Sequence, residues 1–126
     1  MESFKGSEAR IQAALNDVYA LPLPNVVQEL ADRLGLKLTA LVAGKIDTRC
    51  VQRWISGQKP SEGDALRAAL QATRAIAERY DNNAARAWFR STNSRFDLRA
   101  PILVLRDIRT RHDYDRFVQC ALLDVS

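Results

Sequence analysis

The sequence predicts an all-α fold. Apolar residues recur at spacings of three and four in nearly every segment, which is the period of an amphipathic helix. Glycine and proline fall between these segments, where they end one helix and precede the next. The length of the chain is that of one domain. We expect a helical arm at residues 1–21, a middle helical region at 22–80 and a C-terminal helical region at 81–126.

A proline-rich turn is expected to separate the first two helices. Ser7 can cap the first helix, and the pair Pro22 and Pro24 is expected to end it because proline lacks a backbone N–H. Asn25 is expected to cap the second helix, and Gly35 to end it in a left-handed conformation. The apolar stripes of these helices are Ile11, Leu15 and Val18, and then Val26, Val27, Leu30, Ala31 and Leu34.

Two short helices joined by a turn are predicted next. The first is expected over residues 39–43. The second begins after Asp47 or Thr48, either of which can cap a helix, and ends at Gly57. Its inner face consists of Val51, Trp54 and Ile55, which leaves the outer face to Arg49, Gln52 and Arg53.

The longest helix is expected to follow Pro60. Ser61 and Asp64 are spaced like a capping box at its start, and Asp81–Asn83 is expected to break it after about five turns. One face of this helix carries Leu66, Ala69, Leu70, Thr73, Ile76, Ala77 and Tyr80. Its length makes it the expected centre of the fold.

Three shorter elements complete the chain. A helix over residues 84–89 precedes a loop at 91–94, and the apolar run 101–105 fits a short helix better than a strand because Pro101 suits a first helical turn. The last helix is expected to begin near Asp113. Its apolar stripe is Tyr114, Phe117, Val118, Ala121 and Leu122.

The composition disfavours an enzyme. The 126 residues include 19 Lys and Arg, 15 Asp and Glu, and a single histidine, His112, which leaves very little material for a His-based metal site or a Cys-His nucleophile pair. Cys50 and Cys120 lack metal-ligand spacing and are expected to be reduced thiols. We expect no catalytic residue, metal or cofactor, and a cytoplasmic protein without a membrane partner, since no apolar stretch approaches the length of a span.

The basic excess is concentrated in residues 37–60, and this points to nucleic acid. Five basic side chains and one acidic side chain fall there, against a net charge of +4 for the whole chain. Two short helices with an Arg and Gln outer face on the second are what a helix-turn-helix requires. The candidate DNA-binding residues are Lys45, Thr48, Arg49, Gln52, Arg53 and Lys59. The alternative is an ordinary solvated helix face.

A resemblance to known families rests on two strings. Residues 51–60, VQRWISGQKP, resemble the end of the helix-turn-helix in Xre/Cro-like regulators, which has an aromatic residue, Ser-Gly, a basic residue and proline. The string Ala87–Arg90, then Asn93, then Arg99–Asp107 resembles the Xre/MbcA/ParS toxin-binding domain, although Phe89 replaces an aliphatic residue and Phe96–Leu98 stands where glycine is common. This resemblance implies an antitoxin of the RES-Xre type.

The resemblance also implies partners and a second site. Proteins of that type bind and silence a toxin that degrades NAD, and they repress their own operon. The expected partners are therefore a cognate RES-domain toxin and operator DNA, in a homodimer or a larger complex with the toxin. The candidate toxin-binding residues are Trp88, Phe89, Asn93, Phe96, Arg106, Arg109, Arg111 and Tyr114.

Two alternatives remain open from the sequence. The aromatic residues of the C-terminal region are either a partner surface or buried packing, and the alternating charges of residues 106–116 are typical of a solvated face. The whole chain is either such an antitoxin or a stand-alone Xre/Cro-like repressor whose C-terminal half dimerises. Operator symmetry would not separate these two hypotheses, whereas a toxic neighbouring gene product would.

Overall fold

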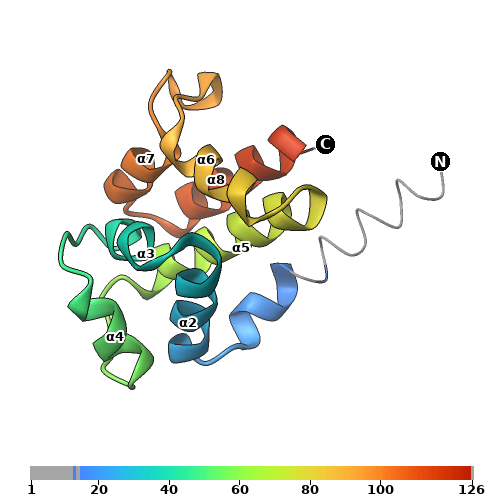
Figure 1. The fold of residues 1–126 in the computed structure, drawn as a ribbon. Helices are drawn as coiled ribbons and strands as arrows, with labels where there is room; N and C mark the ends of the chain where they lie inside the picture. The colour runs from blue at the N-terminus through green and yellow to red at the C-terminus, as the bar shows by residue number, and fades with distance from the viewer. Residues whose placement is uncertain (1–12, 14, 126) are drawn as a thin grey trace.

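The structure, a computed structural model, describes residue 13 and residues 15–125, and within these residues helices joined by turns and loops form the fold, with no strand (Figure 1). This confirms the predicted all-α class. The helices are α2 (Leu23–Leu34), α3 (Leu36–Val42), α4 (Arg49–Ile55), α5 (Gly63–Arg79), α6 (Asn82–Arg90), α7 (Pro101–Asp107) and α8 (Arg111–Val125), with a 3-10 turn η1 (Ser94–Phe96) before α7. Residues 15–20 are also helical.

Helix α5 is the centre of the bundle. It contacts α2, α3, α6 and α8, and in Figure 1 it lies between α2, α3 and α4 in the lower part of the view and α6, α7 and α8 in the upper part. Its side chains are buried on several sides, and not along a single stripe as predicted. The buried residues are Ala65, Leu66, Ala68, Ala69, Leu70, Gln71, Ala72, Thr73, Ala75 and Ile76. Tyr80, expected on the inner face, is 58% exposed.

Helix α2 begins two residues before the predicted cap. Pro22 is the N-cap and Pro24 lies in the first turn, where the missing N–H costs nothing because that turn has no intrahelical acceptor. Asn25 is therefore inside the helix, and its backbone N–H donates to the Pro22 carbonyl at 2.9 Å. The prolines start this helix, so the prediction that both would precede an Asn25 cap was wrong.

Gly35 joins α2 directly to α3. Its φ of +90° confirms the predicted need for glycine, because a side chain would be strained in this conformation. Its carbonyl accepts hydrogen bonds from the backbone N–H of Thr39 at 3.2 Å and from the Thr39 hydroxyl at 2.8 Å. These bonds begin α3 at Leu36, three residues before the predicted start.

The predicted starts of α5 and α6 were also displaced. The capping box at Ser61 does not form, because α5 begins at Gly63 after Glu62, with no side-chain cap bond. Asp81 caps α6 by accepting a hydrogen bond from the Ala84 N–H at 2.7 Å, so the predicted break is itself the first turn of a helix. Helix α7 begins at Pro101 as predicted.

One hydrophobic cluster joins the middle and C-terminal regions. It includes Leu30 of α2, Leu70 of α5, Phe89 of α6, Leu105 of α7 and Phe117 of α8, all of which are at most 1% exposed. The elements on both sides of residue 80 are therefore held by shared apolar burial, which is the main favourable contribution to folding.

The described end of the N-terminal arm packs on this bundle. Leu15 and Val18 are buried, and Leu15 contacts side chains of α5 and α8. Arg67 donates to the carbonyls of Val18 at 2.8 Å and Leu21 at 2.9 Å, while Gln71 donates to the Leu15 carbonyl at 3.1 Å. The predicted cap Ser7 and the apolar Ile11 lie outside the described residues.

Helix α8 begins at Arg111, two residues before the predicted start. Of its predicted stripe, Phe117, Val118 and Ala121 are buried, whereas Tyr114 and Leu122 are half-buried. Both cysteines carry free thiols. Within the described residues no helix is long and apolar enough to cross a membrane.

Candidate functional site

Helix α4 has one buried face and one exposed face. Cys50, Val51 and Trp54 are buried, and α4 contacts α2 and α3. The outer face consists of Arg49, Gln52 and Arg53, all of which are exposed as the sequence predicts. A side chain on this face can therefore reach a partner without disturbing the core.

Both ends of α4 are fixed by local hydrogen bonds. At the start, Asp47 and not the N-cap Thr48 provides the side-chain acceptor, since its Oδ1 accepts the Arg49 N–H at 2.9 Å. At the end, Gly57 has a φ of +117° and donates to the Trp54 carbonyl, while Gln58 donates to the Arg53 carbonyl at 3.0 Å. This pair of bonds is a Schellman motif, which explains why glycine follows the helix.

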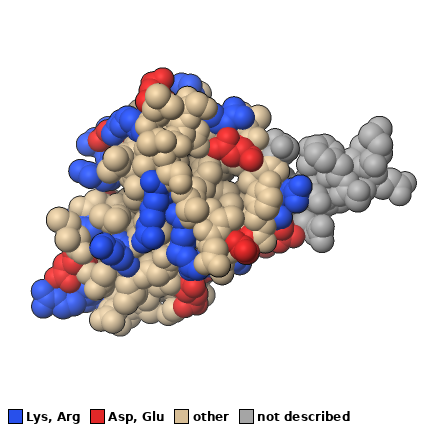
Figure 2. Space-filling model, turned by 45° about the horizontal axis from the view of Figure 1, so that its top comes forward, with Lys and Arg blue, Asp and Glu red and all other residues tan. Residues whose placement is uncertain are grey.

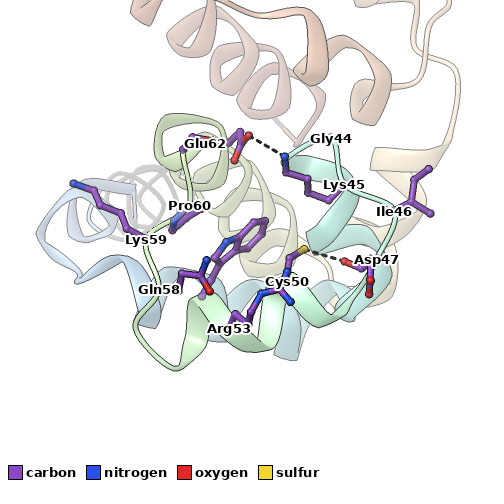
Figure 3. A pocket seen from close by; sticks show the side chains of 12 residues that line it. Gly44, Lys45, Ile46, Asp47, Cys50, Arg53, Gln58, Lys59, Pro60 and Glu62 are labelled. Atoms are coloured by element: carbon purple, nitrogen blue, oxygen red, sulfur yellow. Dashed lines mark hydrogen bonds and ion pairs between the residues drawn. The ribbon is translucent and has the colours of Figure 1, made fainter.

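The other basic residues predicted to bind DNA flank α4 on two loops. Figure 3 shows a hollow between the turn at residues 44–47 and the loop at 58–62. Its volume is about 610 Å³. Lys45 and Lys59 line it, and both are exposed. Lys45 Nζ lies 3.6 Å from Glu62 Oε1, whereas the other oxygen of Glu62 is buried and has no hydrogen-bond partner among the described residues.

The surface carries both charge signs. On the face in Figure 2, Lys and Arg side chains gather near the centre and along one edge of the described part, and acidic groups are interspersed among them. The positive charge on this face is therefore arranged in local clusters rather than as one uniform field.

The aromatic residues of the C-terminal region pack against one another. The Trp88 ring meets Phe89 edge-on at a centroid distance of 5.1 Å and Phe117 at 5.5 Å, and Phe96 stacks on Phe117 at 5.5 Å. Phe89 is fully buried, so its ring packs inside this cluster and has no surface that a partner could contact. Trp88 and Phe96 are half-buried. These geometries are typical of favourable aromatic pairs.

Asp124 of α8 ties this cluster to the loop that follows α6. Its Oδ2 accepts hydrogen bonds from Trp88 Nε1 and Asn93 Nδ2, both at 2.8 Å, and its Oδ1 accepts from Arg95 Nε at 2.6 Å. Burial alone would raise the pKa of Asp124, but the hydrogen bonds from Trp88, Asn93 and Arg95 outweigh it and lower the pKa. Sequence reasoning missed Asp124. The sequence pattern that could have identified it is an acidic residue seven positions after Phe117, which places it on the apolar stripe of α8.

The loop at residues 91–100 has a strained tip, and Figure 1 shows it projecting from the bundle between α6 and α7. Asp97 and Leu98 have φ values of +55° and +65°, in the region that glycine prefers. Asn93 holds this conformation: its carbonyl accepts the N–H of Leu98 at 2.9 Å. The Leu98 side chain at this tip is 70% exposed.

The remaining candidate toxin-binding residues lie around the α7–α8 connection. Arg106 is exposed, and Arg109 donates to the carbonyls of Arg106 at 2.9 Å and Ile108 at 3.1 Å. Arg111 lies over the Tyr19 ring at 4.5 Å. Tyr114 is half-buried, and burial raises the pKa of its hydroxyl. The two predicted sites are thus separate: one on α4 and its flanking loops, the other on the C-terminal helices.

Comparison with protein-family models, with curated proteins and with solved structures found no match to this chain. Within the described part, no group of three or more His, Cys, Asp or Glu side chains is placed to hold a metal ion.

Proposed function

We propose that the protein is a DNA-binding antitoxin that represses its own operon through α4 and covers a RES-type, NAD-degrading toxin with its C-terminal helices. The observation that supports DNA binding is the outer face of α4, where Arg49, Gln52 and Arg53 are exposed above a buried inner face. Arginine binds guanine and glutamine binds adenine through paired hydrogen bonds in the major groove. Helix α3 would brace α4 against the DNA.

The DNA-binding part is tested with Arg53→Ala. Fluorescence anisotropy with a duplex from upstream of the gene should show affinity at least about ten-fold weaker, since a base-contacting arginine contributes on that scale. The matched control is Arg90→Ala, which removes an exposed arginine from α6. Equal affinity of Arg53→Ala and wild type across a range of salt concentrations would refute the role of α4.

The antitoxin part is supported by the resemblance and by the shape of the C-terminal surface. The bonds to Asp124 fix the loop that presents Leu98, and Leu103 on α7 is also exposed. Apolar anchors at the centre of an interface with a charged rim are the common arrangement in protein complexes. Leu98 would enter a pocket of the toxin, and Arg106 would lie on the rim. Inhibition would be steric.

Co-expression with the neighbouring gene tests this part. The neighbour alone should arrest growth and deplete NAD, and this protein should restore growth and copurify with it. Leu98→Asp should abolish both rescue and copurification while leaving DNA affinity unchanged. Tyr80→Asp, which places the same charge at another exposed apolar position, should preserve them.

A second candidate is a stand-alone repressor that dimerises through its C-terminal half. The exposed Leu103 on α7 and Leu123 on α8 favour it, because burial of such residues stabilises a dimer. A harmless neighbour that does not copurify, together with a dimer by light scattering that Leu123→Asp dissociates, would place this function first.

A further inference from the structure

Arg49 and Asp47 form a closed pair at the start of α4. Arg49 Nε lies 2.9 Å from Asp47 Oδ2 and 3.1 Å from Oδ1, and Nη2 lies 2.6 Å from Oδ2. The same carboxylate accepts the backbone N–H of Arg49. The Asp47 carboxylate therefore links one edge of the Arg49 guanidinium to the backbone N–H of the same residue.

The pair is exposed, yet its geometry is well defined. The side chains of Arg49 and Asp47 are 79% and 51% exposed, so neither is held by packing. Hydrogen bonds from the Arg49 side chain and backbone lower the pKa of Asp47 to about 2. The carboxylate therefore stays ionised near neutral pH and keeps accepting from Arg49.

The opposite edge of the Arg49 guanidinium is available. Nε and one N–H of Nη2 are directed to Asp47, which leaves both N–H groups of Nη1 and the second of Nη2. In the described part of the chain these groups have no hydrogen-bond acceptor. One N–H of Nη1 and the free N–H of Nη2 are parallel, and this pair of donors matches the O6 and N7 acceptors of guanine in the major groove.

The position of Arg49 suits a base contact. It is the first residue of α4, and the N-terminal residues of a recognition helix are those that contact base edges. We propose that Asp47 is a specificity-determining residue, which orients Arg49 so that the free edge of its guanidinium selects guanine at one position of the bound DNA. This inference rests on the proposed DNA-binding function of α4 and adds the base that the site selects.

The pair has an electrostatic consequence that can be measured. Arg49 and Asp47 together are neutral, so they contribute selectivity and little attraction to phosphates. Removing the carboxylate adds one net positive charge to the surface and frees the Arg49 side chain to reach phosphates. Selectivity for guanine should therefore fall while sequence-independent affinity stays equal or increases. Loss of folding would instead lower both.

The experiment selects duplexes from a randomised pool with the full-length chain, and then measures anisotropy on the selected duplex and its single-base variants. The wild type should prefer guanine at one position by about ten-fold or more, and Arg49→Lys should reduce this preference toward parity, because lysine keeps the charge without the planar pair of donors. Asp47→Ala should lose the preference at that same position, with equal or tighter binding to unselected DNA.

Two further variants control for folding and charge. Asp47→Asn keeps one oxygen that can accept the Arg49 backbone N–H, but it removes the negative charge and the second acceptor oxygen. This variant should also lose the preference for guanine. Asp115→Ala removes an exposed carboxylate, 3.7 Å from Arg111 on α8, and should leave the preference intact. Thermal unfolding by circular dichroism verifies that each variant is folded.

The outcomes separate this inference from the function on which it rests. If Asp47→Ala and Asp47→Asn keep the wild-type guanine preference at the Arg49 position, the inference is overturned while DNA binding by α4 stands. If Arg49→Lys changes no base preference, Arg49 is not the base-contacting residue and the inference is again overturned. If the wild type selects no sequence and binds no duplex, both the inference and the DNA-binding function fail.

Discussion

Asp124→Ala should destabilise the protein by about 3 kcal/mol. The change removes the common acceptor of Trp88 Nε1 and Asn93 Nδ2, each at 2.8 Å. Hydrogen bonds to a charged group contribute about 1.5–3 kcal/mol each, and the 23% exposure of the Asp124 side chain places these two at the lower end. The third bond, to the 42% exposed Arg95, adds less than about 1 kcal/mol.

This loss is large against the roughly 5–15 kcal/mol that stabilises a typical domain. It should lower Tm by about 10 °C and should also reduce the urea midpoint, followed by circular dichroism and by tryptophan fluorescence. The control is Asp115→Ala, whose exposed ion pair with Arg111 at 3.7 Å predicts a change within about 0.5 kcal/mol.

Wild type and Asp124→Ala together also test how the contribution of Asp124 to stability depends on pH. The pKa of Asp124 is lowered in the folded state, so its contribution is fully present above the unfolded pKa of about 3.9 and is lost as the pH falls through the lower folded value. The stability difference between wild type and Asp124→Ala should therefore shrink in strong acid. A variant as stable as wild type at neutral pH, or a difference unchanged in strong acid, would refute the structural role of Asp124.

Three other predictions concern the fold that supports the sites. Leu70→Ala should cost about 2–5 kcal/mol in urea unfolding, because this fully buried side chain lies at the centre of α5 and its loss leaves a cavity. Gly57→Ala should cost about 1–2 kcal/mol by the same measurement through backbone strain at φ +117°, although no atom lies within 4 Å of the added carbon; an unchanged midpoint would contradict the assigned turn. Glu29→Gln should cost about 2 kcal/mol by weakening the bonds at 2.6 and 2.8 Å to Arg74 and at 2.9 Å to Arg33. Hydrogen bonds from Arg74 are the main reason that the pKa of Glu29 is lowered, so its contribution is present above the unfolded pKa of about 4.3 and should fade in acid as the pH falls through the folded value.

Sequence reasoning predicted which segments are helical better than where they begin. The stripe of Phe117, Val118 and Ala121 placed α8 correctly, because a period of 3.6 residues extends over many residues and tolerates local exceptions. A helix start depends on one or two hydrogen bonds. Several residues near each start could form them, and at Asp81 the expected break proved to be the cap.

The candidate DNA-binding surface was also largely predictable. The spacing of Val51 and Trp54 identifies the buried face of α4, so the exposed face follows from helical geometry alone. The pairing of Arg49 with Asp47 was not predictable, because a surface arginine has many rotamers and the sequence does not determine which acceptor it meets.

By itself, the sequence determined the helical class, the positive φ of Gly35 and Gly57 at the ends of helices, and the exposure of the outer face of α4. Each of these follows from local geometry. Only the tertiary structure decided that Phe89 is fully buried while Leu98 is exposed, and that Asp124 joins α8 to the loop after α6. The physical reason is that burial and long-range hydrogen bonds depend on how distant helices pack. Packing is a property of the whole chain, and it is encoded in no single segment.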